Sequence, residues 1–440
     1  MQVHHQARPI HALTAAAILL TTGGVGLATA RRIPTGSLVY TTPVGRGPTA
    51  AIVDASGHLF VSNDADATVS ALDAATGRLL YTVRTGTAGV LFMQAMALDA
   101  RRQRLFVVTD ADVGTASRLM ALDTRDGHIV RTVSVGHGAC ALAVDTSTSH
   151  VLIANAADHT VSLLDTAGLT LVRTVRVSYA PTTIALDVRA ARAVVVGYSD
   201  PNERTMGWAS VLDTRSGALL RTVGVGDGAG TVVVDAPAGR AVVANEGDGT
   251  LSLLDTRSGR VVRTVSVSPG PMTLAVDEHR GRVFVMNGWD GALRLVDTRT
   301  GTLLRTTYLG ASSTAMAAPP RTLAVDARRG RVFVTAWGRT DATGLPAGTG
   351  RVHILDASTG AVRATITVGV APVAISVEER SGRAIIVNGG GVVDADGGWP
   401  GQLRRRARQW LPWLPWLLPD ATKQRPAPGS ISVLAPSAAS

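Results

Sequence analysis

Carboxylate, imidazole and indole side chains in the longer loops are the first candidates for chemistry in this chain. Carboxylates bind cations or basic ligands, imidazoles transfer protons or coordinate metals, and an indole ring supplies a flat apolar contact. The candidate ligand-binding residues are Asp110, Asp112, His137, His159, Asp200, Glu203, Trp208, Trp289, Asp290, Trp337 and Asp341. The competing interpretation is that the acidic groups are ordinary solvated loop residues.

The spacing of these residues matches no catalytic or metal-binding motif. The histidines are scattered, and the chain has no His-x-x-x-His, Cys-x-x-Cys, Gly-x-Ser-x-Gly, phosphate-binding loop or dinucleotide fingerprint. It also lacks an acid spacing of the EF-hand type. We therefore assign no catalytic residue and expect neither a bound metal nor a cofactor.

A second candidate site is the segment 389–429, in which arginines precede tryptophans that alternate with prolines. Proline at every third residue forbids a regular α-helix, and tryptophan beside clustered arginine is typical of lipid headgroup contacts. Two alternatives are a flap packed over the channel mouth and a disordered linker. The candidate residues for membrane or partner contact are Arg404, Arg405, Arg406, Trp410, Trp413 and Trp416.

These residues must be positioned by a repeat of roughly 40–50 residues, which is typical of a propeller. Each copy resolves into four short runs rich in Val, Ile and Thr; the copy at 322–369 is a clear example. Asp-x-x-x-Gly turns such as Asp255 to Gly259 join the runs, because Asp bonds the main chain and Gly permits positive φ. The repeat therefore predicts an all-β fold.

Eight copies of the second run predict an eight-bladed β-propeller with four strands in each blade. A seven-bladed ring would require one degenerate unit. The last copy lacks its fourth strand, whereas an orphan strand at 36–45 precedes the first copy. We expect this N-terminal strand to complete the last blade, which removes the free sheet edges.

The repeats resemble the YVTN family of β-propeller repeats. The resemblance rests on a short tag that ends in Asn: Phe60–Asn63, Leu152–Asn155, Val242–Asn245, Phe284–Asn287 and Ile385–Asn388. It covers about 35–388 and 430–435, and it is specific for fold rather than function. It implies a protein of the cell surface or periplasm, in a family that includes binding modules and surface-layer proteins. We expect the tag Asn to order the turn that follows it.

Strand alternation divides the connections between two faces of the propeller. Connections after second and fourth strands open on one face, here called the loop face, and those after first and third strands open on the turn face. The long loops at 110–117, 199–208, 338–350 and 389–429 all follow second strands. We therefore expect binding on the loop face, because elaborated loops on a rigid scaffold carry most binding sites.

The net charge of +10 is carried almost wholly by arginine. These arginines alternate with Asp instead of clustering with aromatic residues, so we expect no nucleic-acid partner. The single cysteine, Cys140, excludes an intramolecular disulfide, and its apolar neighbours indicate a small core residue.

The first thirty residues resemble an export signal. An apolar stretch from Ala12 to Ala30 follows a weakly basic start and ends in Ala-Thr-Ala, which predicts a signal peptide at 1–30 and a propeller domain at 31–440. An uncleaved anchor is the alternative. We expect an extracytoplasmic protein that is secreted or associated with the cell envelope.

The sequence favours a non-enzymatic scaffold that binds a ligand or protein through the loop face. The expected partner is an envelope protein or polymer, with peripheral membrane contact as a further option, and the expected state is a monomer. The alternative is a propeller enzyme, either a lactonase-like hydrolase or a cofactor-dependent oxidoreductase, with its active site on the same face.

Overall fold

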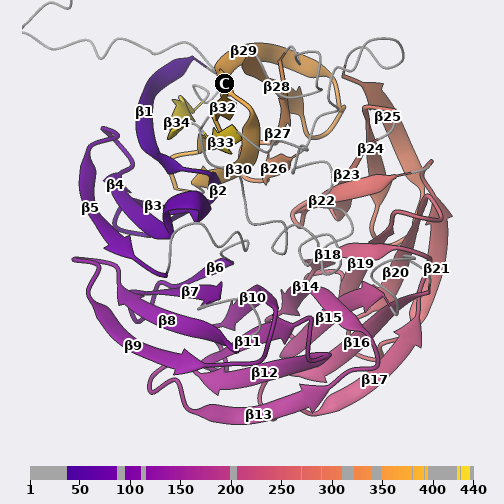
Figure 1. Ribbon diagram of the computed structural model, residues 1–440. Helices are drawn as coiled ribbons and strands as arrows, with labels where there is room; N and C mark the ends of the chain where they lie inside the picture. Colours follow the sequence, from indigo (N-terminus) through magenta and orange to yellow (C-terminus); the bar gives the residue numbers. More distant parts are fainter. Residues whose placement is uncertain are drawn as a thin grey trace, which may run out of the picture. The chain divides into compact units, whose positions relative to one another are not determined.

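The computed structural model describes residues 37–86, 95–110, 115–198, 206–268, 270–288, 290–309, 322–338, 348–378, 380–390, 392–394, 424–426 and 428–436. The propeller belongs to one compact unit, Pro34–Ser440. Its blades follow one another around a ring, and each blade is a four-stranded antiparallel sheet (Figure 1). The prediction of eight four-stranded blades is confirmed.

The strands of the first four blades have the following bounds. Blade 1 contains β2 (Pro48–Val53), β3 (His58–Asn63), β4 (Thr68–Asp73) and β5 (Leu79–Arg84). Blade 2 contains β6 (Met96–Asp99), β7 (Arg104–Asp110), β8 (Ser117–Asp123) and β9 (Ile129–Ser134). Blade 3 contains β10 (Ala139–Asp145), β11 (His150–Asn155), β12 (Thr160–Asp165) and β13 (Leu171–Arg176). Blade 4 contains β14 (Ala180–Asp187), β15 (Arg192–Tyr198), β16 (Gly207–Asp213) and β17 (Leu219–Gly224).

The remaining blades repeat this order. Blade 5 contains β18 (Ala229–Asp235), β19 (Arg240–Asn245), β20 (Thr250–Asp255) and β21 (Val261–Ser266). Blade 6 contains β22 (Pro271–Asp277), β23 (Arg282–Asn287), β24 (Ala292–Asp297) and β25 (Leu303–Tyr308). Blade 7 contains β26 (Leu323–Asp326), β27 (Arg331–Ala336), β28 (Thr349–Asp356) and β29 (Val362–Val370). Blade 8 contains β30 (Pro372–Glu378), β31 (Arg383–Asn388), β34 (Pro428–Leu434) and β1 (Leu38–Arg46).

Blade 8 joins the two ends of the propeller. Strand β1 pairs antiparallel with β34, and the register places Thr41 opposite Ser432. The Tyr40 hydroxyl donates a 2.8 Å hydrogen bond to the carbonyl of Ala74 in blade 1. Burial raises the pKa of Tyr40 to about 12, so this donor stays protonated at neutral pH. The predicted closure by the N-terminal strand is confirmed, and it gives blade 8 four strands like the other blades.

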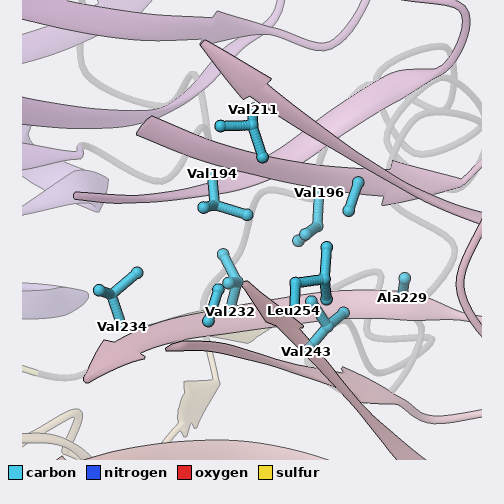
Figure 2. Close-up of a cluster of buried hydrophobic side chains, with 10 residues drawn as sticks. Val194, Val196, Val211, Ala229, Val232, Val234, Val243 and Leu254 are labelled. Atoms are coloured by element: carbon cyan, nitrogen blue, oxygen red, sulfur yellow. The ribbon is translucent and has the colours of Figure 1, made fainter. Parts of the chain in front are cut away.

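The hydrophobic core lies between the blades rather than at the centre of the molecule. Among the described residues, eight apolar clusters fill the eight interfaces between neighbouring blades, the interface between blades 8 and 1 included. Figure 2 shows the cluster between blades 4 and 5, in which Val194, Val196 and Val211 face Val232, Val243 and Leu254. Each blade is therefore stabilised by both of its neighbours, as expected for repeats that cannot bury an apolar face alone.

Exposure rises from the middle strands of a blade to its outer edge. Strands such as β3, β11 and β19 are buried along almost their whole length, because neighbouring blades cover both faces of the sheet. Fourth strands such as β9 and β13 are largely exposed. The Asp turns behave as predicted: Asp73 Oδ1 accepts main-chain N–H bonds from Ala75 at 3.0 Å and Thr76 at 2.8 Å.

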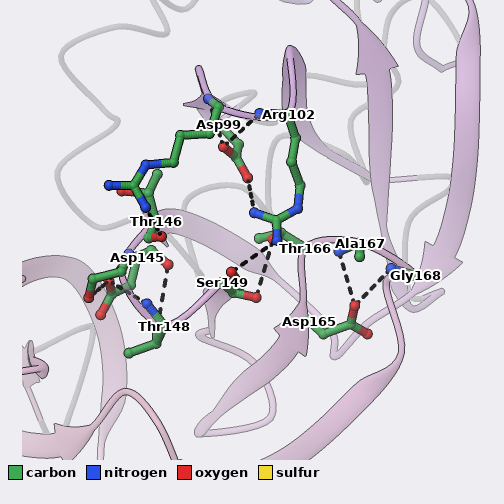
Figure 3. A network of polar contacts seen from close by, with 12 residues as sticks. Asp99, Arg102, Asp145, Thr146, Thr148, Ser149, Asp165, Thr166, Ala167 and Gly168 are labelled. Carbon is green, nitrogen blue, oxygen red and sulfur yellow. Dashed lines mark hydrogen bonds and ion pairs between the residues drawn. The ribbon is translucent and has the colours of Figure 1, made fainter.

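Buried aspartates at the ends of first strands connect the blades on the turn face. A threonine hydroxyl of the next blade donates to each of three such aspartates: Thr214 to Asp145 at 2.6 Å, Thr256 to Asp187 at 2.6 Å and Thr298 to Asp235 at 2.5 Å. In blade 2 the equivalent Asp99 instead accepts from Arg102, which also donates to Ser149 of blade 3 (Figure 3). The turn face is thus occupied by contacts that hold the ring together.

Two short strands extend from blade 8 on the loop face. Strand β32 (Val392–Asp394) pairs antiparallel with β33 (Gln424–Pro426), so the two ends of the 389–429 segment lie together. Strands β31 and β34 pair directly with each other on the propeller side of this segment. In the part of the chain that the structure describes, no helix has the length and apolar character needed to cross a bilayer.

Candidate functional site

His137 lies on the loop face, in the connection from β9 to β10. Its Nδ1 is 3.0 Å from Asp158 Oδ1, and its main-chain N–H donates to Asp158 Oδ2 at 2.7 Å. The same contact occurs elsewhere in the repeat, because the main-chain N–H of Asp227 donates to Asp248 at 2.8 Å. The main-chain N–H and guanidinium of Arg46 bond Asp66 in the same way, both at 2.7 Å. The carboxylate therefore connects successive blades, and we call the contact between His137 and Asp158 the latch.

His159 directly follows Asp158 and has an unusual backbone conformation. Its φ is +55°, in the left-handed region, and the equivalent position before the third strand is held by Gly249 in blade 5 and Gly291 in blade 6. The main-chain N–H of Val177 donates to its carbonyl at 2.9 Å. The position of His159 is therefore set by the turn that its backbone forms.

Two of the candidate tryptophans belong to the packed interior of the blades. Trp208 on β16 is half-buried and packs against the apolar cluster between blades 3 and 4. Trp337 follows β27 and is only 9% exposed. Both residues contribute to packing at the loop-face ends of their blades.

Asp290 forms an ion pair inside blade 6. Its Oδ2 lies 2.5 Å from Arg294 NH2, and Arg294 also donates to Ser268 Oγ at 3.0 Å. Burial alone would raise the pKa of Asp290, but the hydrogen bonds from Arg294 and from the main chain of Ala292 lower it below its usual value. Arg294 is 5% exposed, so its charge depends on Asp290. A ligand cation would have to compete with this guanidinium for the carboxylate.

Of the remaining candidates, Asp110 lies on a described strand. Asp110 is the last residue of β7, opposite Ser117 in the register. The other candidates lie outside the described residues: Asp112, Asp200, Glu203, Trp289, Asp341, Arg404, Arg405, Arg406, Trp410, Trp413 and Trp416. The described candidates belong to connections and strands of five different blades, 2, 3, 4, 6 and 7, and do not form one cluster. No group of three or more potential metal ligands occurs among the residues that the structure describes.

The structure adds three exposed side chains on the loop face that sequence reasoning did not select. Met206 before β16 is 55% exposed, Met272 at the start of β22 is 47% exposed, and Tyr308 at the end of β25 is 71% exposed. Single methionines and tyrosines carry no sequence signal, so only the fold could identify them. Arg294 did carry a signal: it occupies a strand interior where five of the other blades have Ser, as in Thr250-Leu251-Ser252.

Two open grooves lie at the outer edge of the propeller, between neighbouring blades. The larger, of about 640 Å³, separates β17 from blade 5 and is lined by Arg221, Arg260, Asp248, Ser252, Thr264 and adjacent small and valine residues. The smaller, of about 530 Å³, lies between β5 and the hairpin of blade 2 and includes Tyr81 and His128. Both grooves are open to solvent, so neither has the enclosure of a small-molecule active site.

Two solved structures have a fold similar to that of this chain. Among solved structures, BamB from Moraxella catarrhalis is similar with a TM-score of 0.56 and 15% identity, over 91% of this chain and 100% of that one. Dihydro-heme d1 dehydrogenase NirN in complex with DHE is similar with a TM-score of 0.56 and 14% identity, over 74% of this chain and 67% of that one. At these identities the likeness shows the propeller fold alone. No curated protein matches the chain.

A family model covers most of the sequence. The model described as outer membrane protein assembly factor BamB matches residues 2–183 and 205–403. The matched residues make up well over half of the 440-residue chain. The protein therefore belongs to the BamB family of β-propellers.

Proposed function

We propose that the protein is a non-enzymatic scaffold at the cell envelope, which binds an envelope protein through its loop face. Membership of a family described as an outer membrane protein assembly factor supports both the envelope location and a protein partner. The observation that carries the proposal is the exposure of Met206, Met272 and Tyr308 on this face.

These three side chains have the chemistry of interface anchors. Methionine adapts its shape to a partner, and tyrosine offers a large apolar ring with a polar tip. Both residue types are enriched in protein interfaces. The acidic loop residues would surround these anchors as a polar rim, which favours a partner surface with basic groups.

The finer parts of the proposal rest on the sequence. The segment 1–30 is proposed as a signal peptide, and the repeats are proposed to be of the YVTN type. The 389–429 segment is proposed to add a membrane or partner contact through its arginines and tryptophans. In support, β31 and β34 pair through residues 384–388 and 430–434, and β32 and β33 of the segment form a separate two-stranded sheet.

The test begins with the full chain purified from its native envelope and mass spectrometry of proteins that accompany it at stoichiometric amounts. Binding of the purified partner is then measured for a Met206→Ser, Met272→Ser, Tyr308→Ser variant. The matched control is Leu171→Ser, Val172→Ser, Val262→Ser, which removes side chains that are 61%, 47% and 53% exposed on fourth strands. We expect the loop-face variant to lose at least tenfold in affinity, since interface anchors carry about 1–2 kcal/mol or more each.

If the loop-face variant retains binding and the control variant loses it, the proposal is wrong and the partner binds at the outer edge of the propeller. If the purified protein contains a stoichiometric small cofactor and no protein partner, the scaffold proposal is wrong and the alternative, a propeller enzyme, is favoured.

A further inference from the structure

Five arginines occupy one equivalent position on the outer edges of five consecutive blades. They lie on β9, β13, β17, β21 and β25, opposite the same position of each third strand: Arg131 opposite Ala121, Arg173 opposite Leu163, Arg221 opposite Val211, Arg263 opposite Leu253, and Arg305 opposite Leu295. All five are exposed. We call these residues the arginine arc; it covers blades 2 to 6.

The other three blades hold different residues at this position. Tyr81 lies there in blade 1, Ala364 in blade 7 and Tyr40 in blade 8. Both tyrosine hydroxyls donate to a carbonyl of the next blade, Tyr40 to Ala74 at 2.8 Å and Tyr81 to Thr124 at 2.7 Å. The position therefore joins blades in part of the ring, whereas in the arc its polar end faces solvent.

The stems of four arc arginines, all except Arg131, contact glycines of the following hairpin. A Cβ built on Gly259 would lie 3.1 Å from Arg221 Cδ, and one on Gly301 would lie 2.6 Å from Arg263 Cδ. Gly217 and Gly360 approach Arg173 and Arg305 in the same way. The methylene stems are thus packed at the blade interface, and the guanidinium groups are held at the surface with less conformational freedom than a free side chain has.

No carboxylate pairs with these five guanidinium groups in the part of the chain that the structure describes. Second-strand arginines behave differently: Arg192 bonds Asp213 at 2.7 Å and Arg240 bonds Asp255 at 2.8 Å. None of the eight fourth strands contains Asp or Glu. The outer edge therefore carries positive charge that the protein itself does not neutralise.

We propose that the arginine arc binds a linear polymer of phosphate groups, which runs along the outer edges of blades 2 to 6. Guanidinium groups bind phosphate in bidentate fashion, and the groove of about 640 Å³ beside β17 places Arg221 and Arg260 on one path. The arc lies on fourth strands, and the groove beside β17 extends to Gly226 and Asp248 on the loop face.

The arrangement favours a flexible polymer over the other polyanions. The five strands that carry the arc follow the circumference of the ring (Figure 1), so a flat membrane touches only part of the arc, whereas a flexible chain reaches every member. Apart from Tyr308, the five strands of the arc contain no aromatic residue. Bases of a single-stranded nucleic acid would therefore lack stacking partners.

The test measures binding of long-chain sodium polyphosphate to the full-length protein over a range of salt concentrations. The arc variant is Arg173→Gln, Arg221→Gln, Arg263→Gln. The matched control is Arg118→Gln, Arg328→Gln, Arg351→Gln, which removes the same charge from exposed arginines outside the arc. Melting temperatures of both variants show that each remains folded.

We expect the arc variant to lose about tenfold or more in affinity, with the slope of log affinity against log salt reduced by about 3, one for each lost phosphate contact. The control should stay within about twofold of the parent, a difference of about 0.4 kcal/mol. Orthophosphate and tripolyphosphate should bind far more weakly than the long polymer, because they engage few members of the arc at once.

Equal losses in the two variants would overturn the proposal, since net charge alone would then explain binding. Absence of polyphosphate binding by the parent at low salt would also overturn it. Phosphatidylglycerol vesicles that bind in an arc-dependent manner, without polyphosphate binding, would assign the surface to a membrane. Stronger arc-dependent binding of single-stranded DNA would assign it to nucleic acid.

Discussion

The side chain of Asn155 in blade 3 rests against Gly136 at the end of blade 2, and a Cβ on that glycine would lie 2.5 Å from Asn155 Cγ. The same pairing joins Gly45 to Asn63, Gly226 to Asn245, and Gly369 to Asn388. Asn155 Nδ2 donates to Thr160 Oγ1 at 3.0 Å and Ser162 Oγ at 2.9 Å. The tag Asn thus bonds the start of the third strand across the turn that follows it, and in these blades it packs against a glycine of the preceding blade.

Blade 6 shows what happens when that glycine is replaced. Ser268 stands at the equivalent position with φ +73°, and Asn287 there donates to the carbonyls of Val267 and Ser268 at 3.0 and 2.9 Å. Arg294 occupies the place of the third-strand serine and bonds Ser268 Oγ. Two residues therefore differ together across one blade interface, and the hydrogen bonds of the unchanged Asn287 differ with them.

A double-mutant cycle tests the Gly136–Asn155 contact. Gly136→Ala should destabilise the protein by about 1–3 kcal/mol, because the new methyl group overpacks the interface. Asn155→Ala should also cost about 1–3 kcal/mol, from lost hydrogen bonds in a buried site. In the double variant the methyl group fills vacated space, so the combined cost should fall short of the sum by at least about 1 kcal/mol. Urea unfolding measures all three.

The control for this cycle is Gly224→Ala on β17. A Cβ there meets nothing within 4 Å, and φ is not in the left-handed region. Its effect should lie within about 0.5 kcal/mol of the parent. Strict additivity of the two single changes would show that Gly136 and Asn155 do not depend on each other.

Alanine substitution at two hairpin glycines distinguishes the cost of backbone strain from the cost of a steric clash. Gly57 has φ +84° with no atom near a built Cβ, whereas Gly127 has φ +77° and its Cβ would lie 2.4 Å from Tyr81 Cε2. Gly57→Ala should cost about 1–2 kcal/mol through the left-handed conformation alone. Gly127→Ala should cost about 1–3 kcal/mol more, because the Tyr81 ring is fixed by its bond to Thr124. Equal unfolding free energies for the two variants would show that the ring moves aside freely.

The latch between His137 and Asp158 predicts unequal effects for its two members. Asp158→Ala removes the acceptor of the main-chain N–H and should cost about 1 kcal/mol in urea unfolding. His137→Ala keeps that main-chain bond and should cost less than about 0.5 kcal/mol, since the two side chains are 48% and 36% exposed. A larger loss for His137→Ala than for Asp158→Ala would give the imidazole a role beyond the latch.

Asp165 predicts acid sensitivity in the hairpin of blade 3. Burial by itself would raise its pKa, but hydrogen bonds from the main chains of Gly168, Thr170 and Ala167 and from the Thr170 hydroxyl lower it from 3.8 to about 2. A lowered folded-state pKa stabilises the protein above the unfolded value of 3.8, and this contribution disappears as the pH falls toward about 2.

The variant that tests this is Asp165→Asn, whose amide oxygen still accepts main-chain bonds but carries no charge. Near neutral pH the parent should be more stable than the variant in urea unfolding. The difference should shrink through the range between 3.8 and about 2 and then vanish. A difference independent of pH would mean that the charge of Asp165 contributes nothing.

Much of the fold could be predicted from local patterns, because the residues that determine the strands and turns of a repeat lie within that repeat. The Asp-x-x-x-Gly turns and the period-two apolar runs predicted the strands, and the orphan strand near Tyr40 predicted the closure that β1 and β34 form. Hairpins are local, so residues a few positions apart decide them. Blade number follows by counting.

The candidate site was harder to predict from the sequence than the fold, and the reason is physical. From the sequence, Asp158 and Asp290 look like loop acids that are available to a ligand. In the structure Asp158 bonds His137 at the junction of two blades, and Asp290 pairs with the buried Arg294 of its own blade. Conversely, exposure of Met272 and Tyr308 depends on where a strand ends relative to its neighbours.

By itself, the sequence of this protein determined the β-propeller, the number of blades, the closing strand and the face with long loops. Tertiary structure alone decided which polar groups are neutralised and which remain exposed. Arg240 and Arg263 are both arginines in short β-strands of the same blade, yet Arg240 pairs with Asp255 and Arg263 faces solvent on the outer strand. The reason is that charge pairing and burial depend on which strands lie beside each side chain: β20 places Asp255 opposite Arg240, whereas Arg263 lies on β21, the outer strand of the blade.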